Sequence, residues 1–136
     1  RKLAAEEADL VRRALRSSAA RSTRERAFSP EDLDRYAEAA LKPGALTAAL
    51  AYYRTALRDA LYPWRWRRIT AVSSISAPTL VLWGKDDPAL GVELTHGLEA
   101  RCLGGLTVQY VDDCGHFIQQ ERPELVNASL ERFLLG

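Results

Sequence analysis

The sequence lacks methionine entirely, contains only two cysteines, and has no long uninterrupted run of apolar residues. Because translation starts with methionine and this chain starts with Arg1, we expect a piece of a longer protein. Cys102 and Cys114 lack the CxxC spacing of a zinc site, so we expect free buried thiols, no disulfide and no metal centre. The longest apolar runs, such as residues 78–83, are far shorter than the ~20 residues of a membrane helix, and we expect no apolar leader before a small-residue cleavage site. We therefore expect a cytoplasmic protein that does not bind a membrane.

The charge of the chain is balanced overall but not along its length. The formal net charge is +1, yet residues 1–84 carry 15 basic and 9 acidic side chains, whereas residues 85–136 carry 4 and 9. Such asymmetry can mark a nucleic-acid surface, for which the arginines of residues 12–26 and 54–68 are the candidates. No zinc-finger, RNA-binding or helix-turn-helix signature accompanies them. We therefore favour the solvated polar faces of helices and expect no nucleic-acid partner.

Apolar residues recur at helical spacing through the first 61 residues of the 136-residue chain. Ser29-Pro30 is a typical helix start, because the hydroxyl can accept a hydrogen bond from a free backbone N–H and proline suits the first helical position. Pro43-Gly44 breaks this helix, and Pro63 ends the next one. The three predicted helices carry apolar stripes at Leu3, Leu10, Val11 and Leu15; at Leu33, Tyr36, Ala37, Ala40 and Leu41; and at Leu46, Leu50, Tyr53, Leu57 and Leu61.

From residue 77 onward the pattern changes to short apolar runs. Residues 79–83 form a continuous run between Pro78 and Gly84, which is typical of a strand buried on both faces of a parallel sheet. Residues 107–111 predict a second strand. Two parallel strands cannot cover both faces or close their edges, so we expect further strands from elsewhere. The helices predicted between and after the strands carry Leu90, Leu94 and Leu98, and Val126, Leu130, Phe133 and Leu134, the last helix starting at Pro123.

Two side chains suited to acid–base chemistry follow the two predicted strands. Asp87 stands four residues beyond Trp83, and His116 stands five residues beyond Val111. Because parallel strands joined by a crossover end at the same edge of a sheet, we expect both side chains at one rim. A carboxylate beside an imidazole selects its tautomer and stabilises the imidazolium, which leaves the other ring nitrogen to take a proton.

Other residues compete for these roles. Asp86 is the alternative acid, but it lies one residue nearer the strand and suits a turn equally well, so we favour Asp87. The alternative for His116 is an ordinary loop histidine. His96 falls in a predicted exposed helix, where a surface position is the simplest interpretation.

Three segments resemble a known family. Residues 78–88, PTLVLWGKDDP, resemble the strand and acid loop of α/β-hydrolases, and residues 112–127, DDCGHFIQQERPELVN, resemble their catalytic-histidine loop and final helix. Within that superfamily, the histidine segment and residues 43–54, PGALTAALAYYR, are most similar to soluble epoxide hydrolases. The likeness covers most of residues 28–136.

The resemblance implies an α/β fold in two parts. Residues 1–66 would form a helical lid, and residues 67–136 would form the carboxyl-terminal half of an α/β-hydrolase core, with parallel strands and flanking helices. Trp64 and Trp66 alternate with arginines, and we interpret them as a hinge that joins lid to core rather than as a surface that stacks on nucleic-acid bases.

The resemblance also implies an activity. In epoxide hydrolases an aspartate opens the epoxide to an alkyl-enzyme ester, lid tyrosines donate to the epoxide oxygen, and a histidine paired with an acid activates the water that hydrolyses the ester. By the matching motifs, His116 would be the general base, Asp87 its orienting acid and Tyr53 one lid donor. Tyr53 has the alternative of a packed core residue. Ala51 departs from the asparagine expected before the tyrosine pair.

The nucleophile is missing from this chain. Neither a Gly-x-Ser-x-Gly nor a Gly-x-Asp-x-Gly elbow occurs in the sequence. We therefore expect the chain to be inactive alone and to need an N-terminal half of the same fold, possibly as a separate chain, that carries the nucleophile. The expected substrates are a small hydrophobic epoxide and water, with no cofactor. The alternatives are a haloalkane or haloacid dehalogenase, a serine esterase, and a non-catalytic interaction module of the same fold.

Overall fold

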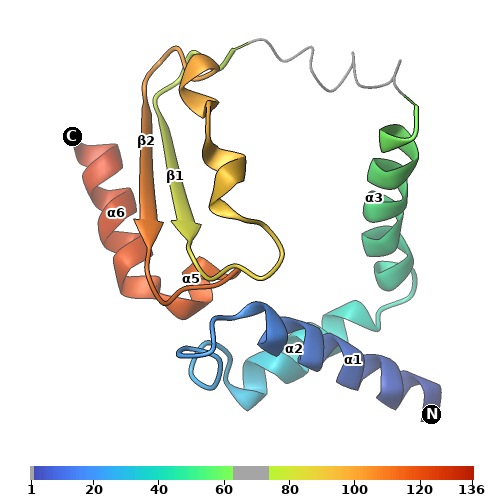
Figure 1. Ribbon diagram of the computed structural model, residues 1–136. Coiled ribbons are helices and arrows are strands. Elements are labelled where there is room, and N and C mark those ends of the chain that lie inside the picture. The colour runs from blue at the N-terminus through green and yellow to red at the C-terminus, as the bar shows by residue number, and fades with distance from the viewer. Residues whose placement is uncertain (1, 63–73) are drawn as a thin grey trace.

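A computed structural model describes residues 2–62 and 74–136. Helices form the first of these parts, and a two-stranded sheet with its flanking helices forms the second (Figure 1). The predicted boundary between lid and core at residues 66 and 67, and the predicted tryptophan hinge, lie outside the described residues. The helices are α1 (Lys2–Ser18), α2 (Pro30–Ala40), α3 (Ala45–Ala60), α5 (Ile118–Glu121) and α6 (Pro123–Leu135); the strands are β1 (Thr79–Gly84) and β2 (Leu106–Val111); and two short 3₁₀ turns are η1 (Val92–Thr95) and η2 (Leu98–Ala100).

Helix α2 starts where the sequence predicts. Ser29 Oγ accepts a hydrogen bond from the Asp32 N–H at 3.1 Å, and Asp32 Oδ2 accepts one from the Ser29 N–H at 3.3 Å, which together form a capping box behind Pro30. The buried face of α2 carries Leu33 and Ala37, each 1% exposed, and this helix packs against α1. The local core of the first part is therefore a cluster of Ala19, Ala27, Phe28 and Leu33, against which Leu15 and Phe117 pack.

Helix α3 forms as predicted, but its apolar stripe is not buried by the described residues. Tyr53 is 66% exposed and Leu57 is 69% exposed. In Figure 1, α3 stands away from the sheet and continues from α2.

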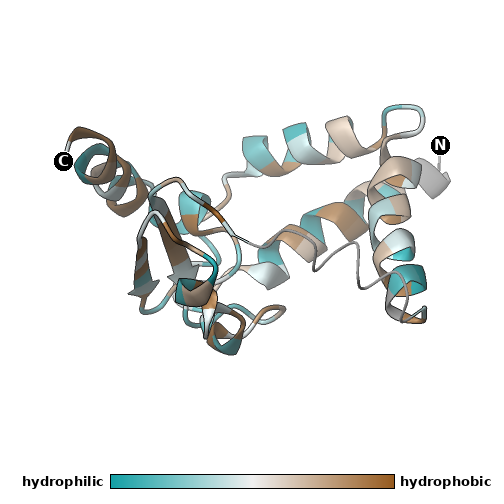
Figure 2. Cartoon of the chain, turned by 90° about the horizontal axis from the view of Figure 1, so that it is seen from above, coloured by the Kyte–Doolittle hydropathy of each residue, from teal (hydrophilic) through white to brown (hydrophobic). Residues whose placement is uncertain are grey.

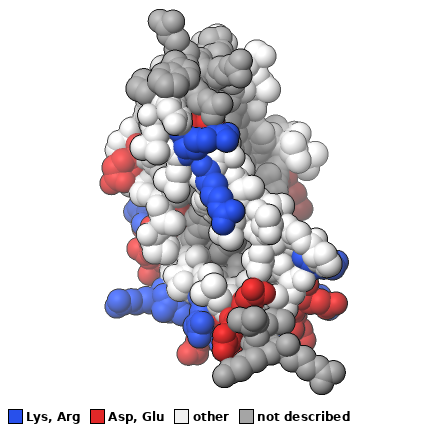
Figure 3. All heavy atoms as spheres, turned by 90° about the vertical axis from the view of Figure 1, so that its right-hand side faces the viewer, with Lys and Arg blue, Asp and Glu red and all other residues white. Residues whose placement is uncertain are grey.

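On the side of the molecule that Figure 3 presents, basic and acidic side chains are interspersed among uncharged ones rather than gathered into one continuous basic surface.

Strands β1 and β2 pair in parallel, in a register that runs from Thr79 opposite Leu106 to Gly84 opposite Val111. Both predicted strands are confirmed, each one residue longer than predicted. Helix α6 lies along the sheet, where Ser129 Oγ donates to Gln109 Oε1 at 2.9 Å (Figure 1). Figure 2 shows the apolar colouring of this part of the molecule, including the turns of α6 that lead to the C-terminus.

The residues of β1 before Gly84 are half-buried, because the described chain provides two strands and little cover, as expected of two parallel strands without further ones. One expectation for this region is wrong. The connection between the strands is not an α-helix but the two 3₁₀ turns η1 and η2. Gly97 between them has a φ of 78°, a left-handed conformation that interrupts a helix, and the preceding His96 is extended and exposed.

Beyond the strands, three backbone segments come into direct contact. The Lys85 N–H donates to Val111 O at 3.0 Å, and the Asp86 N–H donates to Cys114 O at 2.9 Å, so the loops after β1 and β2 stay paired. A Cβ added to Gly84 would overlap the carbonyl oxygen of Gly115. A Cβ added to Gly115 would lie 2.6 Å from Ser18 O, on the turn that follows α1. Glycine at both positions lets these segments pack backbone against backbone.

We expect Gly84→Ala to lower the free energy of unfolding by about 1–3 kcal/mol, because the added methyl group meets rigid backbone. The matched control is Gly91→Ala, since Gly91 has an ordinary φ of −70° and its Cβ would meet only the flexible Glu93 carboxylate. Denaturant unfolding measures both. Equal loss of stability in the two variants would contradict the packing described.

Candidate active site

The site lies at the carboxyl ends of β1 and β2. The loop after β1 carries Asp87 and the loop after β2 carries His116, and the structure brings these two side chains together although they are 29 residues apart. His116 Nδ1 lies 2.8 Å from Asp87 Oδ2. The acid and the imidazole are therefore neighbours at one rim of the sheet, as the strand order predicts.

The Asp87 carboxylate is held at both oxygens. Oδ1 accepts hydrogen bonds from the Ala89 N–H at 2.8 Å and the Leu90 N–H at 3.0 Å, which leaves Oδ2 for His116. These contacts fold the loop around its own side chain, so the carboxylate has little freedom to turn away from the imidazole. The side chain of Asp87 is 8% exposed, whereas that of His116 is 34% exposed.

Electrostatics keeps Asp87 ionised. Its burial alone would raise the carboxyl pKa, but the hydrogen bonds from His116, Ala89 and Leu90 outweigh burial, and the pKa of Asp87 is lowered from its ordinary value. An ionised carboxylate accepts hydrogen bonds and donates none, so His116 Nδ1 carries the proton in the neutral ring. The other ring nitrogen, Nε2, is then the basic atom that faces away from Asp87.

Asp86 does not share this arrangement. It is exposed, and its backbone N–H donates to Cys114 O at 2.9 Å within the paired loops. The choice of Asp87 over Asp86 as the partner of the imidazole therefore matches the geometry. The exposed His96 lies in the connection between η1 and η2 and is not part of the pair.

The two cysteines are free and buried, as predicted. Cys114 is close to the site in sequence but fully enclosed, at 0% exposure, and burial raises the pKa of its thiol to about 11. A thiol in that state is protonated near neutral pH and is a poor nucleophile. Cys114 is therefore a packing residue of the histidine loop.

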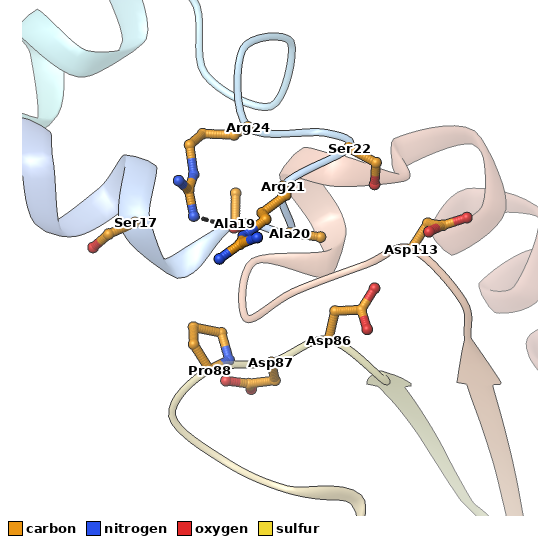
Figure 4. Close-up of a pocket in the computed structure, with 10 residues that line it drawn as sticks. All are labelled: Ser17, Ala19, Ala20, Arg21, Ser22, Arg24, Asp86, Asp87, Pro88 and Asp113. Atoms are coloured by element: carbon orange, nitrogen blue, oxygen red, sulfur yellow. Dashed lines mark hydrogen bonds between the residues drawn. The ribbon is translucent and has the colours of Figure 1, made fainter.

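A cavity of about 600 Å³ opens next to Asp87. Asp86 and Asp87 border it on the strand side and face Arg21 and Ser22, which follow α1, across the opening (Figure 4). The cavity thus has walls from both parts of the chain, and the acid of the pair borders it.

The structure does not bring Tyr53 to the acid–histidine pair. It lies on the exposed face of α3, where its ring meets that of Tyr52 edge to face at 5.8 Å, and no contact in the described part of the chain joins it to Asp87 or His116. The high exposure also differs from a packed core position.

Glu121 is a buried residue of this region that the sequence analysis does not single out. It is 4% exposed and lies at the end of α5, a short helix that was not predicted.

Within the described ranges, no group of three or more His, Cys, Asp or Glu side chains is arranged to hold a metal ion. No helix in those ranges is both long and apolar enough to cross a membrane.

Comparison with protein families gives a match over most of the chain. The model of a family described as "Alpha/beta hydrolase family" matches residues 3–129. Among solved structures, Cfl2 from Burkholderia cenocepacia is similar with a TM-score of 0.75 and 25% sequence identity, over 96% of this chain and 42% of that one.

Curated relatives are similar at modest identity. An AB hydrolase superfamily protein, YfhM of Bacillus subtilis, is 34% identical over 83% of this chain and 37% of its own length. Epoxide hydrolase A of Mycobacterium tuberculosis is 34% identical over 80% of this chain and 32% of its own length. Epoxide hydrolase 4 of Mus musculus is 28% identical over 80% of this chain and 28% of its own length. The chain thus spans about a third of the length of these relatives.

Proposed function

Because the chain belongs to the α/β-hydrolase family, we propose that it supplies the acid–base pair of an enzyme that opens epoxides to vicinal diols. The observation that carries this proposal is the Asp87–His116 hydrogen bond of 2.8 Å at the carboxyl edge of a parallel sheet. The similarity to epoxide hydrolases of several organisms supports the choice of epoxides among the substrates of this family.

In the proposed reaction, His116 acts in the second half. A carboxylate nucleophile attacks an epoxide carbon, the C–O bond of the ring breaks, and the oxygen takes a proton to give a hydroxyl and an alkyl-enzyme ester. His116 Nε2 then removes a proton from water, and the resulting hydroxide adds to the ester carbonyl and releases the diol. Asp87 holds Nδ1–H and stabilises the imidazolium that forms.

The nucleophile and the oxyanion hole belong to a part of the fold that this chain does not contain. We propose that an N-terminal half, on the same or a separate chain, provides them together with further strands. The incomplete cover of the sheet supports this, since most strand residues are half-buried or exposed, whereas a complete parallel sheet would be covered on both faces. On this proposal the chain alone does not turn over epoxide.

Tyr53 is the proposed proton donor of the first half of the reaction. A phenol donates a hydrogen bond without carrying charge, so it stabilises the alkoxide that develops as the ring opens. The exposed position on α3 supports this role, because a side chain that is 66% exposed is available to a substrate held between α3 and the completed core.

We expect His116→Ala, assayed with the nucleophile-bearing half, to form the alkyl-enzyme ester but not to hydrolyse it. The base that activates water is then absent, whereas the attack on the epoxide does not need it. Mass spectrometry of the intact protein should show the mass of the substrate added to the nucleophile-bearing chain. The control is His96→Ala, which removes the histidine that is not part of the pair. Full turnover by His116→Ala would refute the assignment.

For Tyr53→Phe we expect epoxide opening to slow on the order of 10²-fold, as for the loss of one oxyanion donor, while ester hydrolysis keeps its rate. Tyr52→Phe is the matched control, since it removes the neighbouring hydroxyl from the same helix. Single-turnover kinetics separates the two steps. If both steps slow equally in Tyr53→Phe, the tyrosine is a packing residue instead.

A further inference from the structure

Glu121 is a buried carboxylate that the proposed reaction does not use. It is 4% exposed, yet its two oxygens accept four hydrogen bonds from protein groups. Three of the donors reach Oε2: the Gly115 N–H at 2.8 Å, the Ala20 N–H at 3.0 Å and the Thr23 hydroxyl at 2.6 Å. The fourth, the Phe117 N–H, reaches Oε1 at 3.2 Å. All four donors are uncharged backbone or hydroxyl groups.

Two of these donors stand on either side of His116. Glu121 Oε2 accepts a hydrogen bond from the N–H of Gly115, the residue before the histidine. Oε1 accepts one from the N–H of Phe117, the residue after it. The N–H of His116 itself donates to Ser18 O at 2.9 Å. Three consecutive backbone N–H groups are thus fixed, two of them by one side chain, so the imidazole starts from a backbone that cannot rotate freely.

The other two donors belong to the turn after α1, which borders the cavity. Ala20 lines that cavity, and Thr23, three residues further along the same turn, is fully buried. Gly115 packs its backbone directly against that of Ser18 and Ala20, and the Glu121 carboxylate accepts hydrogen bonds from both segments. The histidine loop and this wall of the cavity are therefore joined through Glu121.

The position of the acceptor pair explains why a carboxylate is needed. Both oxygens face N–H donors, so the side chain must accept at both ends. A glutamine would place its own NH₂ donor against one of these N–H groups, and that buried pair of donors would be left without an acceptor. The site therefore discriminates between two side chains of almost the same shape.

We propose that Glu121 is a positioning residue for His116. By fixing the backbone around His116, Glu121 sets the direction of the imidazole toward Asp87 and toward the cavity. This inference rests on the proposed function, in which His116 Nε2 activates water. A change of about 1 Å in such a group costs catalysis on the order of 10²-fold. Glu121 itself touches neither Asp87 nor His116 side chains among the described contacts, so its effect passes through the backbone of residues 115–117.

The test compares Glu121→Gln with Glu124→Gln. Glu124 is exposed in the first turn of α6, so the control makes the same change of charge and shape three residues away. The first readout is the NMR signal of the His116 Nδ1 proton, which the hydrogen bond to Asp87 shifts downfield; His96→Ala separates it from the second histidine. The second readout is the single-turnover rate of each half-reaction with the nucleophile-bearing half present.

We expect Glu121→Gln to lose or shift the Nδ1 signal and to slow ester hydrolysis by a factor on the order of 10², while the ester still forms at the normal rate. Glu124→Gln should change neither. A folded Glu121→Gln with a normal Nδ1 signal and normal ester hydrolysis would overturn the inference. Loss of both half-reactions to the same extent would also overturn it, because that pattern indicates general damage to the fold.

If Glu121→Gln does not fold, Thr23→Val is the second variant, because it removes one donor from Oε2 and keeps the backbone hydrogen bonds. We expect smaller changes of the same kind in the Nδ1 signal and in ester hydrolysis. No change in either would contradict the proposal. If the unsubstituted protein forms no ester with any epoxide while the Nδ1 signal still depends on Glu121, the proposed function is wrong and the positional role of Glu121 stands.

Discussion

The site depends on the parallel pairing of β1 with β2 and on its continuation past their ends. Because Gly84 lies opposite Val111 and the following loops remain hydrogen-bonded, Asp87 and His116 leave the sheet at the same edge and meet at 2.8 Å. The two residues are 29 positions apart in the sequence, so only this strand pairing brings their side chains together. This meeting contributes to the lowered pKa of Asp87, because the imidazole donates to its carboxylate together with the N–H groups of Ala89 and Leu90 in the same loop as Asp87.

The same edge joins the two parts of the chain. Phe117 packs edge to face on Phe28 with ring centroids 5.5 Å apart, and Gln120 Nε2 donates to Tyr36 Oη at 2.9 Å. Glu121 adds polar contacts to the turn after α1. The residues just after the histidine therefore anchor it to the helical part, so the geometry of the acid–base pair and of the cavity wall are set by one small group of contacts.

Much of this arrangement follows from local sequence rules, and the rest does not. The Ser29-Pro30 helix start, the two strands and the meeting of Asp87 with His116 follow from capping, apolar runs and strand order. The sequence does not predict the 3₁₀ connection, because Leu90, Leu94 and Leu98 recur at helical spacing. In the structure, the left-handed Gly97 prevents an α-helix there. Two of the hydrogen bonds to Glu121 come from donors about 100 residues away in the sequence, which no local pattern encodes. The exposure of Tyr53 and of the strand residues is explained, on the proposed function, by further strands and a core that another part of the fold supplies.

The most direct test of the acid–base assignment is the turnover of Asp87→Asn beside that of Asp86→Asn, each with the nucleophile-bearing half present. An asparagine at 87 still fits the loop but favours the wrong imidazole tautomer, so turnover should fall on the order of 10³- to 10⁴-fold, by analogy with the serine-protease triad. Asp86→Asn should stay close to the unsubstituted protein. Equal losses, or a larger loss at position 86, would contradict the account.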